Sequence, residues 1–196
     1  MKIIVAAVPG AGKTTTLEYV KKILPEAKVV NVGDLILEIA KEKFGIKDRD
    51  ELRKKLSLRQ QRELQLQAYK KIASMQEKYV FIDTHIAIKT AYGFFPGVSH
   101  QTAEIIKPEI IILLEYLPEV IIERRIKDTT RKREIESEKE IEEHQEINRE
   151  FAIAVASHVQ ASVEIVNLRY KERKTFEHAE KGAEEIVKIV KKLAQL

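Results

Sequence analysis

A glycine-rich turn followed by a lysine and two threonines stands near the start of the chain, at Gly10-Ala11-Gly12-Lys13-Thr14-Thr15. The apolar run 2–8 before it predicts a buried β-strand, and apolar residues at 17, 20, 23 and 24 recur at helical spacing. Backbone N–H groups of such a turn, with the unpaired donors of the helix N-terminus, bind phosphate oxygens. The sequence therefore predicts a phosphate-binding loop (P-loop), with Lys13 on the outer phosphates of a nucleotide and the Thr14 hydroxyl on Mg²⁺.

The loop departs from the strict motif G-x-x-x-x-G-K-[ST] at its first position, where Ala7 replaces glycine. Alanine costs little there if the residue has an ordinary β conformation, and more if its φ must be positive. A glycine-rich turn without a ligand is the alternative interpretation. The strand pattern before the turn and the helix pattern after it favour the phosphate-binding interpretation.

Asp83 ends a second apolar run, Val80-Phe81-Ile82, which also predicts a strand. A carboxylate at the end of a strand in a P-loop fold positions Mg²⁺, directly or through water. The alternative is an aspartate that caps a helix or a turn. We expect Thr14 and Asp83 to share the metal.

A basic segment lies between residues 124 and 133, where Arg124, Arg131 and Arg133 flank Asp128-Thr129-Thr130. Arginine is always charged, and its planar fork matches phosphate oxygens. Phosphoryl transfer spreads negative charge over the equatorial oxygens of the transferred group. Cations on a closing loop would stabilise that charge, and closure of the loop would exclude water. We therefore expect Lys13 and these three arginines to be the catalytic residues. A solvated charged turn is the alternative.

Other polar residues are weaker candidates. Arg53 could clamp an acceptor phosphate, although a charge on a helix surface is as often merely solvated. Asn31 and Gly33-Asp34 follow a predicted strand, where Gly33 would allow close approach of the backbone. His85 is a candidate for the lining of the same pocket, and a structural histidine is at least as common.

The hydrophobic pattern predicts an α/β fold of one domain, 1–196, with a five-stranded parallel sheet between two layers of helices. Ligands of such sheets bind at the carboxyl ends of the strands. Residues 84–98 show no periodicity and are expected to form a long loop at the site. Strands are expected at 2–8, 28–31, 79–83, 109–114 and 162–167, and helices at 16–24, 35–40, 57–77, 119–126, 137–158 and 179–193.

Composition narrows the class of protein. Charged residues make up 34% of the chain, against about 25% in typical proteins, and the absence of cysteine excludes disulfides and thiolate metal sites. No signal-peptide pattern opens the chain, and no apolar run approaches the about 20 residues that span a bilayer. A cytoplasmic protein without a membrane partner is expected. The net charge of +4 is too small to require a nucleic-acid partner.

Several segments in order along the chain carry a resemblance to a known family. They are Val8 to Thr15, Asn31-Val32-Gly33-Asp34, Asp48-Arg49-Asp50-Glu51-Leu52-Arg53, Phe81-Ile82-Asp83-Thr84-His85, Gly93-Phe94-Phe95-Pro96-Gly97, the Arg124–Arg133 segment and Ile141 to Arg149. The chain resembles the archaeal adenylate kinases, a branch of the nucleoside monophosphate kinases with a short lid. The Asp-Thr-His segment and the Asp-x-Thr-Arg-x-Arg segment are more specific than the P-loop.

The resemblance implies reversible, Mg²⁺-dependent transfer from ATP to AMP, giving two ADP, and a homo-oligomer, commonly a trimer. It implies that residues 7–15 (Ala7, Val8, Pro9, Gly10, Ala11, Gly12, Lys13, Thr14 and Thr15) hold ATP. Residues about 31–60 would form the AMP segment, and residues about 127–137 the lid. The AMP residues would be Asn31, Gly33, Asp34, Arg53, Asp83, His85 and Lys89.

Departures from the family pattern keep alternatives open. Besides Ala7, Lys89 stands where some members have arginine, and Ser99-His100-Gln101 departs from the expected sequence after Pro96-Gly97. One alternative is a kinase for another acceptor, such as CMP, UMP or a compound that is not a nucleotide. The other is an ATP-hydrolysing switch or an RNA-associated NTPase, in which the basic segment contacts RNA.

Overall fold

The computed structural model of the protein describes residues 1–128 and 136–195, without the side chains of Asp50 and Arg53. The strands are β1 (Lys2–Ala6), β2 (Ala27–Asn31), β3 (Tyr79–Thr84), β4 (Ala87–Thr90), β5 (Gly93–Pro96), β6 (Ile110–Tyr116) and β7 (Ser162–Leu168). The helices are α1 (Lys13–Ile23), α2 (Val32–Phe44), α3 (Arg49–Lys55), α4 (Leu58–Ala73), α5 (His100–Ile106), α6 (Pro118–Lys127), α7 (Glu138–Val159) and α8 (Glu177–Leu193).

A five-stranded sheet in the order β2-β3-β1-β6-β7 forms the centre of the fold, and every pairing in it is parallel. The strands are parallel because helices connect them, as the alternating sequence pattern predicted. In the register, Val5 lies beside Asp83, and Asp83 lies beside Asn31. The carboxyl ends of β1, β2 and β3 therefore meet at one edge of the sheet.

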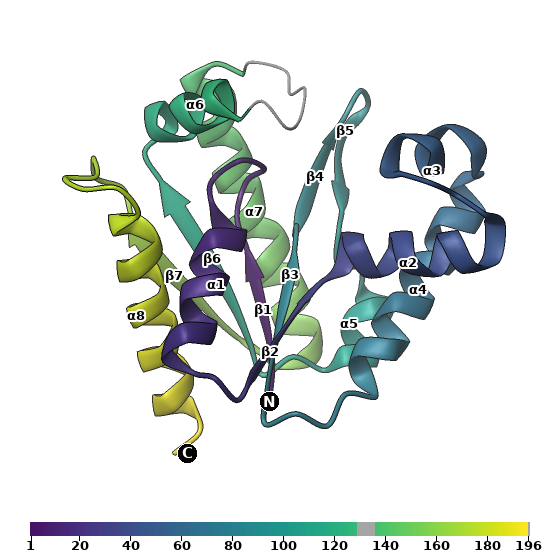
Figure 1. The fold of residues 1–196 in the computed structure, drawn as a ribbon, viewed down its shortest axis with the longest axis horizontal. Helices are drawn as coiled ribbons and strands as arrows, with labels where there is room; N and C mark the ends of the chain where they lie inside the picture. The colour runs from purple at the N-terminus through teal and green to yellow at the C-terminus, as the bar shows by residue number, and fades with distance from the viewer. Residues whose placement is uncertain (129–135, 196) are drawn as a thin grey trace.

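Two layers of helices cover the sheet, as expected (Figure 1). On one face, Ile4, Ile82 and Ile111 pack in a core shared with α2, α4, α5 and α7. On the other face, alternate residues such as Val5 and Phe81 pack against α1 and α8. Residues on both faces of these strands are apolar, which is typical of a parallel sheet buried on both sides.

Helix starts that the sequence predicted are confirmed by their caps. Ser137 accepts a hydrogen bond from the Glu140 backbone N–H, and the Glu140 side chain accepts one from the Ser137 N–H. Pro118 occupies the first turn of α6, where its missing N–H costs nothing.

Gly182, an unfavourable residue inside α8, lies where a Cβ would be 3.0 Å from Thr16 Cγ2, so it allows α8 to pack close to α1.

Three expectations about the elements were wrong. Residues 84–98 are no irregular loop, since β4 and β5 pair antiparallel as a hairpin; four-residue strands are too short to show a period. Helix α2 starts at Val32, three residues before the expected start at 35. Its cap is Asn31, whose side-chain oxygen accepts a hydrogen bond from the Asp34 N–H. Helix α4 ends at Ala73, four residues before the expected end at 77.

Among the helices in the described part of the chain, none is long and apolar enough to cross a membrane.

Candidate active site

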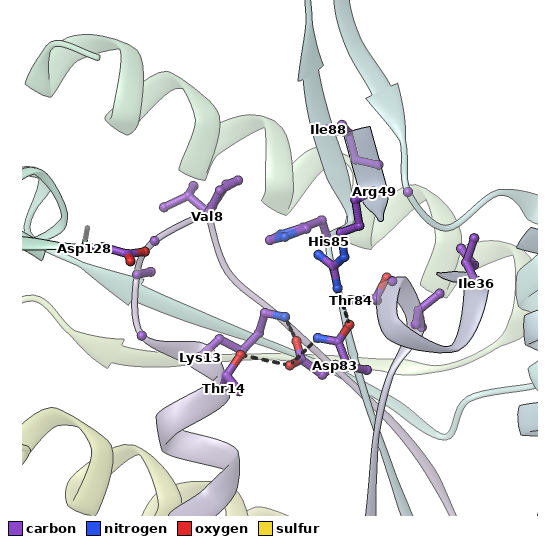
Figure 2. Close-up of a pocket in the computed structure, with 18 of the residues that line it drawn as sticks. Val8, Lys13, Thr14, Ile36, Arg49, Asp83, Thr84, His85, Ile88 and Asp128 are labelled. Atoms are coloured by element: carbon purple, nitrogen blue, oxygen red, sulfur yellow. Dashed lines mark hydrogen bonds and ion pairs between the residues drawn. The ribbon is translucent and has the colours of Figure 1, made fainter. Parts of the chain in front are cut away.

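A cavity of about 340 Å³ opens at the carboxyl ends of β1, β2 and β3. Figure 2 shows the side chains of Lys13, Thr14 and Asp83 at its floor, with Arg49 and His85 on one side and Asp128 on the other. The cavity is lined by Val8, Pro9, Gly10, Ala11, Gly12, Lys13, Thr14, Asn31, Val32, Gly33, Ile36, Arg49, Gln65, Asp83, Thr84, His85, Ile88, Gly97, Arg124 and Asp128.

The predicted phosphate-binding loop joins β1 to α1 and lines this cavity from residue 8 to residue 14. Gly10 has φ of +84° and Gly12 has φ of +98°, conformations that glycine adopts at little cost. Ala7 is buried and is not among the described non-glycine residues with positive φ, so its replacement of glycine causes no backbone strain. Ala7 and Thr15 do not line the cavity themselves.

Lys13 and Asp83 form a buried ion pair at the cavity floor. The second Asp83 oxygen, Oδ2, lies 3.2 Å from the Thr14 hydroxyl and 2.9 Å from the Asn31 amide nitrogen. Burial lowers the pKa of Lys13 to about 7. The structure thus brings together four of the predicted site residues.

The oxygens of Thr14 and Asp83 fit the requirements of Mg²⁺. The ion prefers hard oxygen ligands and is usually held by one or two protein groups together with substrate phosphates and water. Within the described residues there is no group of three or more His, Cys, Asp or Glu side chains that could hold a metal without such a substrate. The floor therefore suits a metal that arrives with a polyphosphate.

His85 lines the cavity, as predicted, and its Nδ1 lies 3.1 Å from the Ala7 carbonyl oxygen. Burial and the nearby charge of Lys13 lower the pKa of His85 to about 3. The ring is therefore neutral near pH 7, and its Nδ1–H donates to Ala7. His85 can support the start of the P-loop and cannot supply a positive charge to a bound phosphate.

Arg49 is a site residue that sequence reasoning missed. It lies in the first turn of α3, and its Nη2 is 3.3 Å from Asn31 Oδ1 and 2.6 Å from Asp34 Oδ1. Asn31 and Gly33 line the cavity as expected, whereas Asp34 pairs with Arg49 outside the lining. The sequence did contain a signal, because Arg49 stands four residues before the predicted Arg53 and so lies on the same face of a helix. Only the fold shows that the start of α3 lies close enough to the cavity for Arg49 to line it.

The remaining predicted residues fall in two groups. The side chain of Arg53 and the whole of Arg131 and Arg133 lie outside the described residues. Lys89 does not line the cavity; its Nζ pairs with Glu136 at 2.7 Å and with Glu140 at 3.0 Å. Gln65, Thr84, Ile88 and Gly97 line the cavity without having been predicted.

Arg124 lies at the cavity wall, as predicted, with its guanidinium held in place on several sides. Its Nη1 donates to the Ala11 carbonyl, and its Nη2 lies 2.7 Å from His178 Nδ1 and 3.2 Å from Glu172 Oε2. The guanidinium carbon is also 4.9 Å from the centre of the Tyr116 ring. In this structure Arg124 thus binds the P-loop backbone, and a phosphate would have to compete with that contact.

Comparison with known proteins agrees with this geometry. The family described as AAA domain matches residues 6–142. The adenylate kinase of Pyrobaculum aerophilum is 48% identical over 196 residues, which cover 100% of this chain and 99% of that protein. The adenylate kinase of Pyrococcus horikoshii is 37% identical, over 99% of this chain and 95% of that protein. The chain belongs to the adenylate kinase family.

Solved structures of other kinases share the fold of this adenylate kinase family member. A shikimate kinase from Bacteroides thetaiotaomicron aligns with a TM-score of 0.59 and 19% identity, over 97% of this chain and 98% of that chain. A shikimate kinase from Aquifex aeolicus aligns with a TM-score of 0.57 and 18% identity, over 100% of this chain and 99% of that chain. At such low identity the likeness concerns only the fold.

Proposed function

We propose that the protein transfers the γ-phosphoryl group of ATP to AMP in a reversible reaction that gives two ADP. One observation supports this most directly: a single cavity is lined by the P-loop on one side and by Asn31, Gly33 and Arg49 on the other. The first side suits a nucleoside triphosphate, and the second offers a cation and an amide to an acceptor phosphate. The curated relatives with high identity carry the name adenylate kinase.

The chemistry needs cations more than it needs a base. An oxygen of the AMP phosphate attacks the γ-phosphorus, while the bond from that phosphorus to the β–γ bridging oxygen breaks, and the electron pair stays on ADP. The acceptor phosphate is already largely an anion near neutral pH, because its second pKa is about 6. Lys13 would neutralise charge on the β- and γ-phosphates, and the P-loop N–H groups would hold them in line with the acceptor.

Thr14 and Asp83 are proposed to hold Mg²⁺ with the ATP phosphates. The metal, when bound, would neutralise charge that develops on the phosphate oxygens. Binding of the triphosphate would also give Lys13 a new anionic partner in place of Asp83. That exchange leaves the Asp83 carboxylate available to the metal, while Asn31 keeps one of its oxygens oriented.

On the acceptor side, residues 31–60 are proposed as the AMP segment, with Arg49 added to Asn31, Gly33 and Arg53. Residues 127–137 are proposed as the lid; the family resemblance and the basic composition support this, while residues 129–135 lie outside the described part. A homo-oligomer, a trimer by the same resemblance, is a further proposal that sedimentation equilibrium would test.

The deciding experiment follows ADP formation as AMP is titrated into protein, Mg²⁺ and ATP. We expect almost no ADP without AMP and stoichiometric formation of two ADP for each AMP consumed. CMP, UMP and shikimate, given in place of AMP, should be much poorer acceptors. ATP hydrolysis without any acceptor, or stimulation by RNA, would contradict the proposal.

A further inference from the structure

Two consecutive arginines of α6 contact the P-loop, Arg124 from the cavity wall and Arg125 from outside the cavity lining. Arg124 donates to the Ala11 carbonyl, and the Nε of its neighbour Arg125 donates to the Pro9 carbonyl at 2.9 Å. Figure 1 places α6 at the same end of the sheet as the loop that leads into α1. Both contacts join residues more than 110 positions apart in the sequence.

A contact to the Pro9 carbonyl controls the direction of the next N–H group. The described peptide bonds are all trans, so the Pro9 carbonyl and the Gly10 N–H point to opposite sides of one planar unit. While Arg125 holds the carbonyl, the Gly10 N–H is directed away from α6. Gly10 lines the cavity and has φ of +84°. The Ala11 N–H donates to the Val8 carbonyl at 3.2 Å and closes the turn around Pro9 and Gly10, and the bond from Arg125 adds a second restraint on the peptide between them.

Arg125 is itself fixed at its other end. Its side chain is only 6% exposed, and its Nη1 pairs with Glu136, whose side chain is 12% exposed. Glu136 is also 2.7 Å from Lys89 Nζ on β4, and Lys89 is 3.0 Å from Glu140 in the first turn of α7. The pairing with Lys89 and Arg125 outweighs the effect of burial and lowers the pKa of Glu136, so its carboxylate stays charged.

We propose that Arg125 is a positioning residue for ATP binding, which holds the Pro9–Gly10 peptide of the P-loop in the orientation that phosphate requires, and that Glu136 holds Arg125. The proposal rests on the function proposed above only for the identity of the nucleotide. Arg125 is too buried to bind phosphate itself, and it acts through the loop. Lysine at this position could reach Pro9 or Glu136 with its single ammonium and would not span both as a guanidinium fork does.

The test compares Arg125→Met, Arg125→Lys and Glu136→Gln with the wild type. Binding of ATP with Mg²⁺ is measured by calorimetry without AMP, KM is measured for each nucleotide, and the melting temperature is recorded. A matched control is Lys71→Met, which removes the exposed pair of Lys71 with Glu38 on the opposite side of the fold from α6. The control should change each quantity by less than about twofold, because exposed pairs contribute little.

We expect Arg125→Met to weaken ATP binding and raise the KM for ATP about tenfold, as for the loss of one hydrogen bond from a charged group. The KM for AMP should stay within about twofold of the wild type, since the acceptor side is untouched. Arg125→Lys should recover part of the ATP affinity. Glu136→Gln should weaken ATP binding in the same direction and to a smaller extent, because the neutral amide still accepts from Arg125.

Two results would overturn the proposal. One is unchanged ATP affinity in a folded Arg125→Met; the other is a lower melting temperature with equal changes in both KM values, which indicates a purely structural role. If Arg125→Met does not fold, Glu136→Gln decides by the same criteria. A wild type that binds ATP but forms no ADP with AMP would contradict the proposed function and leave this inference standing, because ATP binding is measured separately.

Discussion

Lys13 and Asp83 meet as an ion pair at the floor of the cavity, with side chains only 8% and 1% exposed. A buried charge is stable only when an opposite charge contacts it, so Lys13 stays paired with Asp83 until a phosphate binds. The same carboxylate lies beside Thr14 and Asn31. This pair links the two tasks proposed for the site, which are neutralising phosphate and holding a metal.

Removal of the Lys13 ammonium should abolish most of the activity. We expect Lys13→Ala to lower the rate of ADP formation about 10²-fold or more, as for the loss of one donor to the transition state. Lys21→Met, on the exposed side of α1, is the matched control and should keep the wild-type rate. A Lys13→Ala protein with near-normal turnover in a coupled assay would refute the role assigned to Lys13.

Arg49 should contribute to binding of the acceptor and not of the donor. Arg49→Met is expected to raise the KM for AMP about tenfold, the effect of losing one charged hydrogen bond, and to leave the KM for ATP nearly unchanged. Gly33→Ala should have a weaker effect of the same kind, because its Cβ would lie 2.9 Å from Arg49 Nη2 and displace that side chain. Steady-state kinetics with each nucleotide varied in turn would measure both.

The exposed Arg173, between β7 and α8, lies outside the proposed AMP segment and does not line the cavity, so Arg173→Met offers a matched control. That variant should show the wild-type KM for AMP. Equal increases for Arg49→Met and Arg173→Met would indicate a general effect of net charge and would argue against a specific contact.

His85 should make the stability of the protein depend on pH in acid. Its pKa is about 3 in the folded protein, because it is buried near Lys13, and about 6.5 when unfolded. Between these values the unfolded chain binds more protons, so stability is full above pH 6.5 and is lost as pH falls towards 3. A whole proton corresponds to about 1.4 kcal/mol in the free energy of unfolding for each pH unit.

His85→Asn removes this titration and keeps an N–H that can donate to the Ala7 carbonyl. Urea unfolding at pH 6.5 and pH 4.5 should therefore show a smaller loss of stability in His85→Asn than in the wild type. Identical losses in the two proteins would show that His85 does not titrate in this way.

Gly97 should not tolerate a side chain. A Cβ there would lie 2.0 Å from the His85 carbonyl oxygen. The two backbone segments are held together at this point, because the Gly97 N–H donates to the Ile86 carbonyl at 2.7 Å. We expect Gly97→Ala to lower the free energy of unfolding by at least about 3 kcal/mol, or to prevent folding, because neither segment can move aside. Chemical denaturation would measure the change.

Gly45→Asn is a useful comparison, because Gly45 has φ of +66° and a Cβ added there would meet no other part of the protein within 4 Å. Asparagine is tolerated in that conformation, so the change should cost less than about 1 kcal/mol. A Gly97→Ala protein as stable as Gly45→Asn would contradict the close approach of residues 97 and 85.

The sequence alone determined the features that depend on residues close together in the chain. The P-loop between β1 and α1, the apolar strands and the Ser137–Glu140 cap follow from spacings of a few residues, and the structure confirms them. Apolar residues on both faces of the strands require helices on both sides of the sheet. These signals are strong because local hydrogen bonding and hydrophobic periodicity arise from the backbone itself.

Only the tertiary structure decided which side chains meet. The order β2-β3-β1-β6-β7 brings Asn31 and Asp83 beside the P-loop, and the packing of α6 brings Arg124 and Arg125 to its carbonyls. The same packing places the Lys89 ammonium against Glu136 and not in the cavity. Contacts between residues so far apart depend on how helices and strands pack, which no spacing along the chain encodes.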